Sequence, residues 1–273
     1  MERAINPLLI IPTFVSQKVH AEILIKCVTT LRETTDREIL IVDDNSSADV
    51  DDLFTALEEY DNLEVHRKEE NTGFSSTVNI GLARALAEGR DACLINQDIE
   101  FVDPEWLDKM METDAHIIGA LLLYPNYLIQ SAGTYFSQIT RNFAHRFVGS
   151  PPNLPAAQIP CECPVTGALQ YVRLEVLQEI GIYDEKFKLS FEDVDYLIRA
   201  LEAGLRSLYN PEVKAVHHES IVRGVKSERL REWESDSLMY LMTKYSEVDF
   251  RDLNVPTMLG NDEEEREVQL AHH

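Results

Sequence analysis

The feature that most constrains this chain is a regular alternation of short apolar segments with longer amphipathic ones over its first hundred residues. Three of the apolar segments are almost continuously hydrophobic, as expected for strands that are covered on both faces of a sheet. The amphipathic segments have helical periodicity, and the last one stops at Gly89. The predicted strands are residues 8–11, 39–42, 63–66 and 92–95, and the predicted helices are residues 18–31, 50–60 and 75–87. This alternation predicts an α/β fold with a mostly parallel sheet and right-handed crossovers.

The second half of the sequence is less regular. Residues 124–160 contain five prolines, which predicts long loops or a small flap. Helical patterns return at residues 173–180 and 191–203, each followed by a glycine that favours a helix end. We also predict strands at residues 207–209 and 213–216, an amphipathic helix at 227–245 that packs on the domain, and a solvated acidic end at 261–268.

The charge of the chain excludes several classes of function. Its 273 residues include 25 Lys and Arg against 48 Asp and Glu, so the formal net charge is −23. Nucleic acid and anionic bilayers would repel such a chain, and we expect neither as a partner. We also expect no membrane span and no signal peptide, because no apolar run reaches the required length of about 18 residues. Four cysteines are too few for a disulfide framework, which favours a reducing, cytoplasmic location.

Polar residues follow three of the predicted strands, where ligands bind in sheets of this kind. Asp98 lies just beyond the fourth strand, between Asn96 and Glu100. Carboxylate oxygens at a strand end suit Mg²⁺ or Mn²⁺, although a solvated acidic turn before a helix is the alternative.

Asp43 and Asp44 follow the second strand and could accept hydrogen bonds from a nucleotide base or ribose. Alternatively, the polar residues after them, Asn45, Ser46 and Ser47, could cap the next helix.

Four further motifs contain side chains or glycines that could take part in chemistry or binding. Glu192, Asp193 and Asp195 begin a predicted helix, where a carboxylate could act as a general base or simply complement the helix dipole. His217 and His218 end an apolar strand and could bind a metal or be structural. The other candidates are a glycine turn at Asn71-Thr72-Gly73-Phe74, which could contact a phosphate or sugar, and the pair Cys161 and Cys163, which we interpret as structural.

Taken in order, these segments resemble the family 2 glycosyltransferases of the GT-A fold, and in particular their rhamnosyltransferase-like branch. The resemblance extends over about residues 7–220. Its motifs are Ile10-Ile11-Pro12-Thr13-Phe14, Ile41-Val42-Asp43-Asp44-Asn45-Ser46-Ser47, Asn71-Thr72-Gly73-Phe74, Asn79-Ile80-Gly81, Leu94-Ile95-Asn96-Gln97-Asp98, Val165-Thr166-Gly167-Ala168, Gly181-Ile182-Tyr183-Asp184-Glu185, Phe191-Glu192-Asp193-Val194-Asp195, Arg199, Gly204, and Pro211 to His217. The chain departs from the family in one place, because Asn96 stands where the metal motif has its first acid.

The resemblance implies a GT-A fold, with a Rossmann-like sheet covered by helices on both faces and a C-terminal helical extension. Residues 1–225 would form the glycosyltransferase domain, with a nucleotide-binding half at about 1–100 and an acceptor-side half at about 101–225. Residues 226–273 would add the C-terminal helix and the acidic tail. The implied activity is that of an inverting hexosyltransferase, which transfers a sugar from a UDP- or dTDP-sugar to a hydroxyl group with the help of Mn²⁺ or Mg²⁺.

The resemblance also assigns roles to residues. Asp193 would be the general base, with Glu192 beside it, and Asp98 and His217 would hold the metal. The residues that would border the nucleotide sugar are Pro12, Thr13, Asp43, Asp44, Gly73, Asn96, Gln97, Gly167 and Ala168. The acceptor would be a soluble glycan, a protein or a small molecule. Two other functions stay open, a nucleotidyltransferase and a non-catalytic protein that binds sugar nucleotides.

Overall fold

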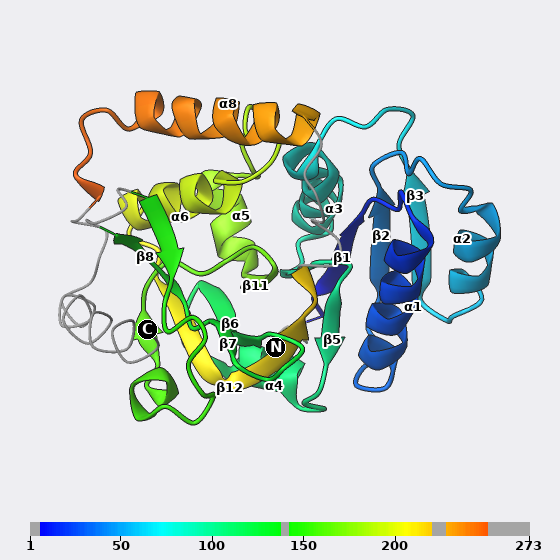
Figure 1. The fold of residues 1–273 in the computed structure, drawn as a ribbon, viewed down its shortest axis with the longest axis horizontal. Helices are drawn as coiled ribbons and strands as arrows, with labels where there is room; N and C mark the ends of the chain where they lie inside the picture. The colour runs from blue at the N-terminus through cyan, green and yellow to red at the C-terminus, as the bar shows by residue number, and fades with distance from the viewer. Residues whose placement is uncertain (1–5, 138–141, 220–227, 251–273) are drawn as a thin grey trace.

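The computed structural model describes residues 6–137, 142–219 and 228–250, and its first half follows the predicted alternation (Figure 1). Each strand and helix predicted there is present, with ends that differ by at most three residues. The elements are β1 (Leu8–Thr13), α1 (Lys18–Arg32), β2 (Ile39–Asp43), α2 (Asp51–Leu57), β3 (Leu63–Arg67), α3 (Phe74–Glu88) and β4 (Ala92–Ile95). Gly89 ends α3 in the left-handed conformation, with φ of 63°, as the sequence predicted.

Strands β3, β2, β1 and β4 lie side by side in that order and are all parallel. The pairing of β1 with β2 runs to Thr13 opposite Asp43, so both strands end at the same edge of the sheet. Because successive side chains of a strand point to opposite faces, β1 contributes side chains to two hydrophobic cores, one on each face of the sheet. Leu8 and Ile10 belong to one buried cluster, and Leu9 and Ile11 belong to the other. The nearly continuous hydrophobicity of these strands is therefore explained.

Antiparallel strands extend the sheet beyond β4. The order continues β4-β11-β6-β12-β10, with β12 parallel to β6 and the other pairs antiparallel. Two short strands add to it, β5 beside β12 and β7 beside β6. The bounds are β5 (Ile99–Phe101), β6 (Ile117–Leu123), β7 (Ile129–Ser131), β10 (Cys161–Glu162), β11 (Leu169–Val172) and β12 (Ser207–His217). The prediction missed β5, β6, β7, β10 and β11, and it split β12 into two strands.

The split prediction has a physical reason. The register of β12 against β6 shifts between Asn210 and Lys214, and Pro211 lies within that irregularity. Proline lacks the N–H that a regular ladder needs, so within a sheet it is found at edges and bulges. The sequence break at this proline is thus a bulge within one strand.

The proline-rich segment 124–160 is only partly loop. It contains β7, a separate two-stranded sheet of β8 (Thr134–Ser137) with β9 (Asn142–His145), and the 3₁₀ helix η1 (Pro155–Gln158). For this segment the sequence predicted either long loops or a small flap, and the β8–β9 pair corresponds to the flap. Its ring contacts include Phe136 with Phe143, whose centroids are 5.3 Å apart.

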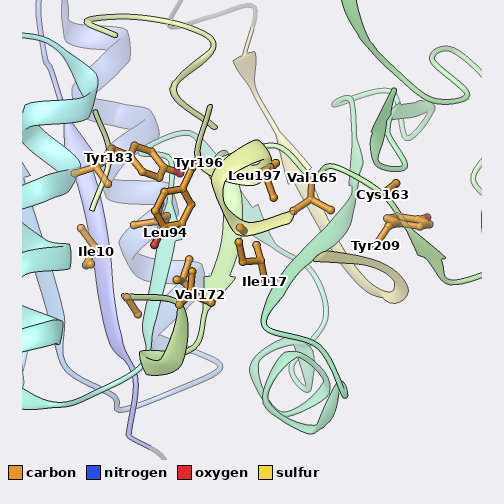
Figure 2. Packing of buried hydrophobic residues seen from close by; sticks show 14 of the residues in the cluster. Ile10, Leu94, Ile117, Cys163, Val165, Val172, Tyr183, Tyr196, Leu197 and Tyr209 are labelled. Atoms are coloured by element: carbon orange, nitrogen blue, oxygen red, sulfur yellow. The ribbon is translucent and has the colours of Figure 1, made fainter. Parts of the chain in front are cut away.

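Helices cover both faces of the sheet (Figure 1). Apolar residues of α1, α2 and α4 (Trp106–Glu112) pack in one core, and those of α3, α5 (Leu174–Ile180) and α6 (Glu192–Glu202) pack in the other. Figure 2 shows part of the second core, in which Tyr183 and Tyr196 lie close to Leu94. Among the described helices, none has the length and apolar character needed to cross a membrane.

The last described helix, α8 (Glu228–Lys244), runs along the outside of the molecule from above α3 to above α6 (Figure 1). Leu241 and Tyr245 are buried in a third apolar cluster with residues of α6, which agrees with the expectation that this helix packs on the domain. Residue 227 and the predicted acidic end at 261–268 lie outside the described residues.

Candidate active site

The carboxyl ends of β1, β2 and β4 meet through hydrogen bonds at one edge of the sheet. The Asp44 N–H donates to the Thr13 carbonyl at 2.8 Å, next to Pro12. The Gln97 side chain, beyond β4, accepts from the Phe14 N–H at 2.7 Å and donates to the Phe14 carbonyl at 3.3 Å. The sequence motifs predicted to meet at this edge therefore do so, and the Gln97 amide is used to join two loops.

Asp43 is enclosed by the protein. Its side chain has no exposed surface, and its carboxylate accepts hydrogen bonds from the Ser46 N–H at 3.1 Å, from the Ser46 hydroxyl and from Arg67 Nε at 3.2 Å. Ser46 does not cap α2, whose N-cap is Val50. Ser46 therefore binds the Asp43 carboxylate instead of capping the next helix. Asp43 in turn stabilises the loop that follows β2, and its carboxylate is already occupied by groups of the protein.

Asp44 has a different set of partners. One carboxylate oxygen accepts from Lys68 Nζ at 2.6 Å and from the Thr72 N–H at 3.0 Å, and the other accepts from the Gly73 N–H at 3.0 Å. Its side chain is only 9% exposed. Asp44 therefore shapes the turn that opens α3, at the edge where a nucleotide is expected.

Lys68 was missed by the sequence analysis. Besides Asp44, its ammonium group donates to three hydroxyl groups at 2.6 to 3.0 Å, those of Thr72, Ser76 and Thr77. The only signal for it in the sequence is a basic residue just after the third predicted strand, opposite a pair of acids after the second.

The glycine turn at Gly73 is confirmed as the start of a helix. Gly73 is the N-cap of α3 with φ of 104°, a conformation that side chains disfavour. A Cβ atom built on Gly73 would lie 2.5 Å from the Lys188 carbonyl oxygen, so the turn also needs the absence of a side chain. Asn79, farther along α3, hydrogen-bonds the backbone of Tyr183 in both directions, which gives this resemblance motif a structural role.

Asp98 and His217 are brought together by strand pairing. β5 runs antiparallel to β12 with His217 opposite Ile99, which places Asp98 beside the end of β12. His217 Nε2 lies 3.1 Å from Asp98 Oδ1, and the two side chains are 6% and 5% exposed. Within residues 6–137, 142–219 and 228–250, no group of three or more His, Cys, Asp or Glu side chains is arranged to hold a metal. The predicted metal site is thus a pair of ligands.

Glu100 and His218 form a second pair beside the first. His218 Nε2 and Lys26 Nζ lie 2.9 Å and 2.6 Å from Glu100 Oε2. Burial alone would raise the pKa of Glu100, but hydrogen bonds from Lys26 and His218 outweigh it and lower that pKa. Since its carboxylate is already paired with a lysine and a histidine, Glu100 has a structural role beside the candidate cation site.

Asn96 lies between the two parts of the site. Its N–H donates to the Ala168 carbonyl at 2.8 Å, which ties the loop after β4 to the start of β11. Its Oδ1 atom is buried and has no hydrogen-bond partner in the described part of the chain. An orphaned buried acceptor is costly, and it marks a place where a donor group fits.

Asp193 is held at the start of α6. The helix begins after Phe191, which has φ of 67°, and the Gly167 N–H donates to Asp193 Oδ2 at 3.1 Å. Glu192 is 8% exposed. Burial and the nearby carboxylates of Asp193 and Glu192 raise the pKa of the Tyr183 hydroxyl. Asp193 is therefore hydrogen-bonded to Gly167, one of the residues that the resemblance places beside the sugar.

Asp195, the third acid of this motif, faces away from the site. Its side chain has no exposed surface and contacts Arg199, Lys244 and the Tyr245 hydroxyl at 2.6 to 2.9 Å. Arg199 in turn donates to the carbonyls of Ile180 and Ile182. These contacts fix α6 against α5 and α8.

The predicted structural role of Cys161 and Cys163 agrees with the geometry, because both thiols are buried. A hydrogen bond with Cys161, together with burial, raises the pKa of Cys163 well above its ordinary value.

Comparisons with known proteins agree with this geometry. Residues 8–127 match the model of the glycosyl transferase family 2. The chain is 27% identical over 202 residues to the O-antigen biosynthesis protein RfbC of Myxococcus xanthus, covering 68% of this chain and 15% of that protein. It is 24% identical over 217 residues to the N-acetylglucosaminyl-diphospho-decaprenol L-rhamnosyltransferase of Mycobacterium tuberculosis, covering 70% of each.

A solved structure supports the fold. The crystal structure of GalNAc-T7 with UDP, GalNAc and Mn²⁺ superposes with a TM-score of 0.61 at 18% identity, covering 80% of this chain and 44% of that one. The chain therefore spans less than half of GalNAc-T7 and about a seventh of RfbC. Together the comparisons confirm the predicted GT-A fold and support a relationship of this chain to the family 2 glycosyltransferases.

Proposed function

We propose that the chain is an inverting glycosyltransferase, which moves a hexose from a nucleotide diphosphate to an acceptor hydroxyl group. One arrangement carries the proposal. The Gly167 N–H holds Asp193, while the next residue, Ala168, accepts from the Asn96 N–H two residues before Asp98. The candidate base and the candidate cation site thus border one stretch of backbone. The match to family 2 over residues 8–127 supports the same reaction.

The donor is proposed to bind at the ends of β1 and β2. Pro12 and Thr13 border this edge, and the turn held by Asp44 supplies Gly73 where backbone can approach a ligand closely. Asp44 acts by shaping the turn, because its oxygens are already engaged. A UDP- or dTDP-sugar is our proposed donor, and UDP is bound in the GalNAc-T7 structure.

A divalent cation fits the Asp98–His217 pair. Adjacent ligands of an octahedral ion with bonds of about 2.1 Å are separated by about 3 Å, which agrees with the 3.1 Å between Asp98 Oδ1 and His217 Nε2. In the described part of the chain, neither Lys nor Arg forms an ion pair with Asp98. We propose that this pair holds Mn²⁺ or Mg²⁺, whose positive charge would stabilise the negative charge that develops on the departing diphosphate.

Asp193 is proposed to be the general base. Its carboxylate takes the proton of the acceptor hydroxyl as that oxygen attacks the anomeric carbon from the face opposite the diphosphate, and this inverts the configuration. The hydrogen bond from the Gly167 N–H keeps one carboxylate oxygen in place. General-base catalysis of this kind contributes about 10²- to 10⁴-fold in rate. Glu192 is proposed to contact the sugar or the acceptor beside it.

The proposed organisation assigns donor binding to about residues 1–100 and acceptor binding to about 101–225. Residues 226–273, which include α8, are proposed as an extension of this domain. We propose a glycan, a protein or a small molecule as the acceptor, because the net charge of −23 disfavours anionic surfaces.

The test is incubation of the full chain with a panel of nucleotide sugars, with and without Mn²⁺, while the release of nucleoside diphosphate is measured. Release that depends on the sugar and increases with Mn²⁺ would support the proposal. Proton NMR of the product should then show the inverted anomeric configuration. Release of pyrophosphate from a nucleoside triphosphate and a sugar phosphate would indicate a nucleotidyltransferase, and donor binding without turnover would indicate a binding protein.

A further inference from the structure

A β-bulge places Gln130 beside the candidate cation site. In the pairing of β6 with β7, Leu122 lies opposite Ser131, but its neighbour Leu123 lies opposite Ile129. Gln130 is therefore the extra residue of β7. Bulges re-aim side chains and are frequent next to active sites. Here the bulged residue is 2% exposed, although its side chain is polar.

The Gln130 amide joins two ionisable side chains. Its nitrogen donates to Glu219 Oε2 at 3.1 Å, and its oxygen lies 2.7 Å from His217 Nδ1. A carboxylate only accepts hydrogen bonds, so the NH₂ group must face Glu219 and the carbonyl oxygen must face the imidazole. The Gln130 carbonyl oxygen can only accept a hydrogen bond, so His217 Nδ1 must carry the proton that it donates. Glu219 sets the orientation of the Gln130 amide by accepting from its NH₂ group.

The tautomer has a consequence for the other ring nitrogen. When Nδ1 carries the proton of a neutral imidazole, Nε2 presents a lone pair. Nε2 lies 3.1 Å from Asp98 Oδ1, which also presents lone pairs. Two acceptors at this distance need a positive charge between them, either a metal ion or a second proton on the imidazole.

We propose that Gln130 is a positioning residue, which keeps His217 in the tautomer that lets Nε2 act as a metal ligand. The proposal rests on the proposed function, because it assumes that the Asp98–His217 pair binds the divalent ion. Groups that hold the second nitrogen of a ligating histidine change metal affinity by about 10- to 100-fold. Gln130 is suited to this role because the bulge aims it and burial keeps water from competing.

The experiment measures Mn²⁺ binding to the full chain by electron paramagnetic resonance, with no donor or acceptor present. Gln130→Leu keeps the approximate volume and removes both hydrogen bonds, and we expect its Kd for Mn²⁺ to rise tenfold or more. The matched control is Gln170→Leu, which removes another fully buried amide, one that contacts the Tyr183 hydroxyl instead of His217. Its Kd for Mn²⁺ is expected to stay within about twofold of the wild-type value.

A second measurement reads the tautomer directly. In metal-free protein, ¹⁵N NMR of the histidine side chains should show the Nδ1–H form of His217 in the wild type and a loss of this preference in Gln130→Leu. An unchanged tautomer and unchanged Mn²⁺ affinity in Gln130→Leu would overturn the role of Gln130 alone, while the wild type still binds Mn²⁺. If neither the wild type nor Asp98→Asn bound Mn²⁺, the cation site of the proposed function would fail, and the inference with it.

Discussion

Lys68 Nζ lies 2.6 Å from Asp44 Oδ1, and the two side chains are only 10% and 9% exposed. The lysine also reaches the hydroxyl groups of Thr72, Ser76 and Thr77. One ammonium group thus joins the end of β2 to the first turn of α3, on which the candidate donor site is built. Although the net charge of the chain is −23, the buried carboxylate of Asp44 is neutralised here by the buried ammonium group of Lys68.

Replacement of this lysine should therefore be costly. In Lys68→Met the Asp44 carboxylate stays buried without its counter-ion, and we expect the free energy of unfolding to fall by about 3 kcal/mol. Urea denaturation measures it. The control is Lys18→Met, because Lys18 pairs with Glu22 at 3.5 Å and both side chains are well exposed. That pair should contribute less than about 0.5 kcal/mol. Equal effects of the two substitutions would contradict the role of Lys68.

Asp193→Asn should separate binding from catalysis. The amide keeps the shape of the side chain and can still accept from the Gly167 N–H, but it cannot take a proton from the acceptor. We expect kcat to fall by about 10²- to 10⁴-fold, while the Kd of the donor changes less than about threefold. Glu202→Gln, at the exposed end of the same helix, serves as the control. Substantial turnover by Asp193→Asn would remove Asp193 from the role of base.

The two acids after β4 should respond differently to substitution. Asp98→Asn removes a charge from the candidate cation site, so we expect activation by Mn²⁺ to be lost. Glu100→Gln removes a carboxylate that is occupied by Lys26 and His218, so activation by Mn²⁺ should persist. Initial rates over a range of Mn²⁺ concentrations distinguish the two variants. Similar Mn²⁺ profiles would mean that the wrong acid has been assigned.

The attachment of α8 should make stability depend on pH. Burial alone would raise the pKa of Asp184, but hydrogen bonds from Lys244, from the Lys186 N–H and from Tyr240 lower it. A carboxyl group whose folded pKa is depressed stabilises the fold above its unfolded pKa of about 4, and this contribution is lost as the pH falls through the folded value. Lys244→Met should therefore flatten the acid limb of a plot of the unfolding free energy against pH. An unchanged acid limb would show that this ion pair contributes nothing.

Gly119 tests the packing of β6. A Cβ atom at this position, in the middle of a fully buried strand, would overlap the Val165 side chain. We expect Gly119→Ala to destabilise the fold by about 1–3 kcal/mol through overpacking. Adding Val165→Ala should recover part of this loss, because neighbouring substitutions couple. Thermal denaturation of the two single variants and the double variant measures this. Purely additive losses would contradict the steric explanation.

Local patterns explain how much of the fold could be predicted. Strand β1 and helix α3 were predicted because burial on both faces and helical periodicity are visible in a short window. The strand β6 was missed, although all seven of its residues are buried, because a short apolar run has no periodicity that separates strand from helix. Its partners on β11 and β12 lie about 50 and 90 residues away along the chain.

The site shows the same limit. The acids of the site were found because they follow strands or begin a helix, but the sequence does not show what each one contacts. Asp43 and Asp44 look alike in the sequence, yet Asp43 binds Ser46 and Arg67 and Asp44 binds Lys68 and the turn at Gly73. Gln130 gave no signal at all, because a bulge is a property of two paired strands.

Helix α8 touches both sides of the candidate site. Near its start, the Arg229 guanidinium donates to the carbonyl of Asn71, the first residue of the glycine turn that opens α3, at 2.9 Å. At its end, Lys244 Nζ lies 2.6 Å from Asp195, which follows Asp193 by two residues on α6. The helix thus connects the proposed donor loop with the proposed base. We expect that a molecule which displaced α8 would weaken both donor binding and proton removal.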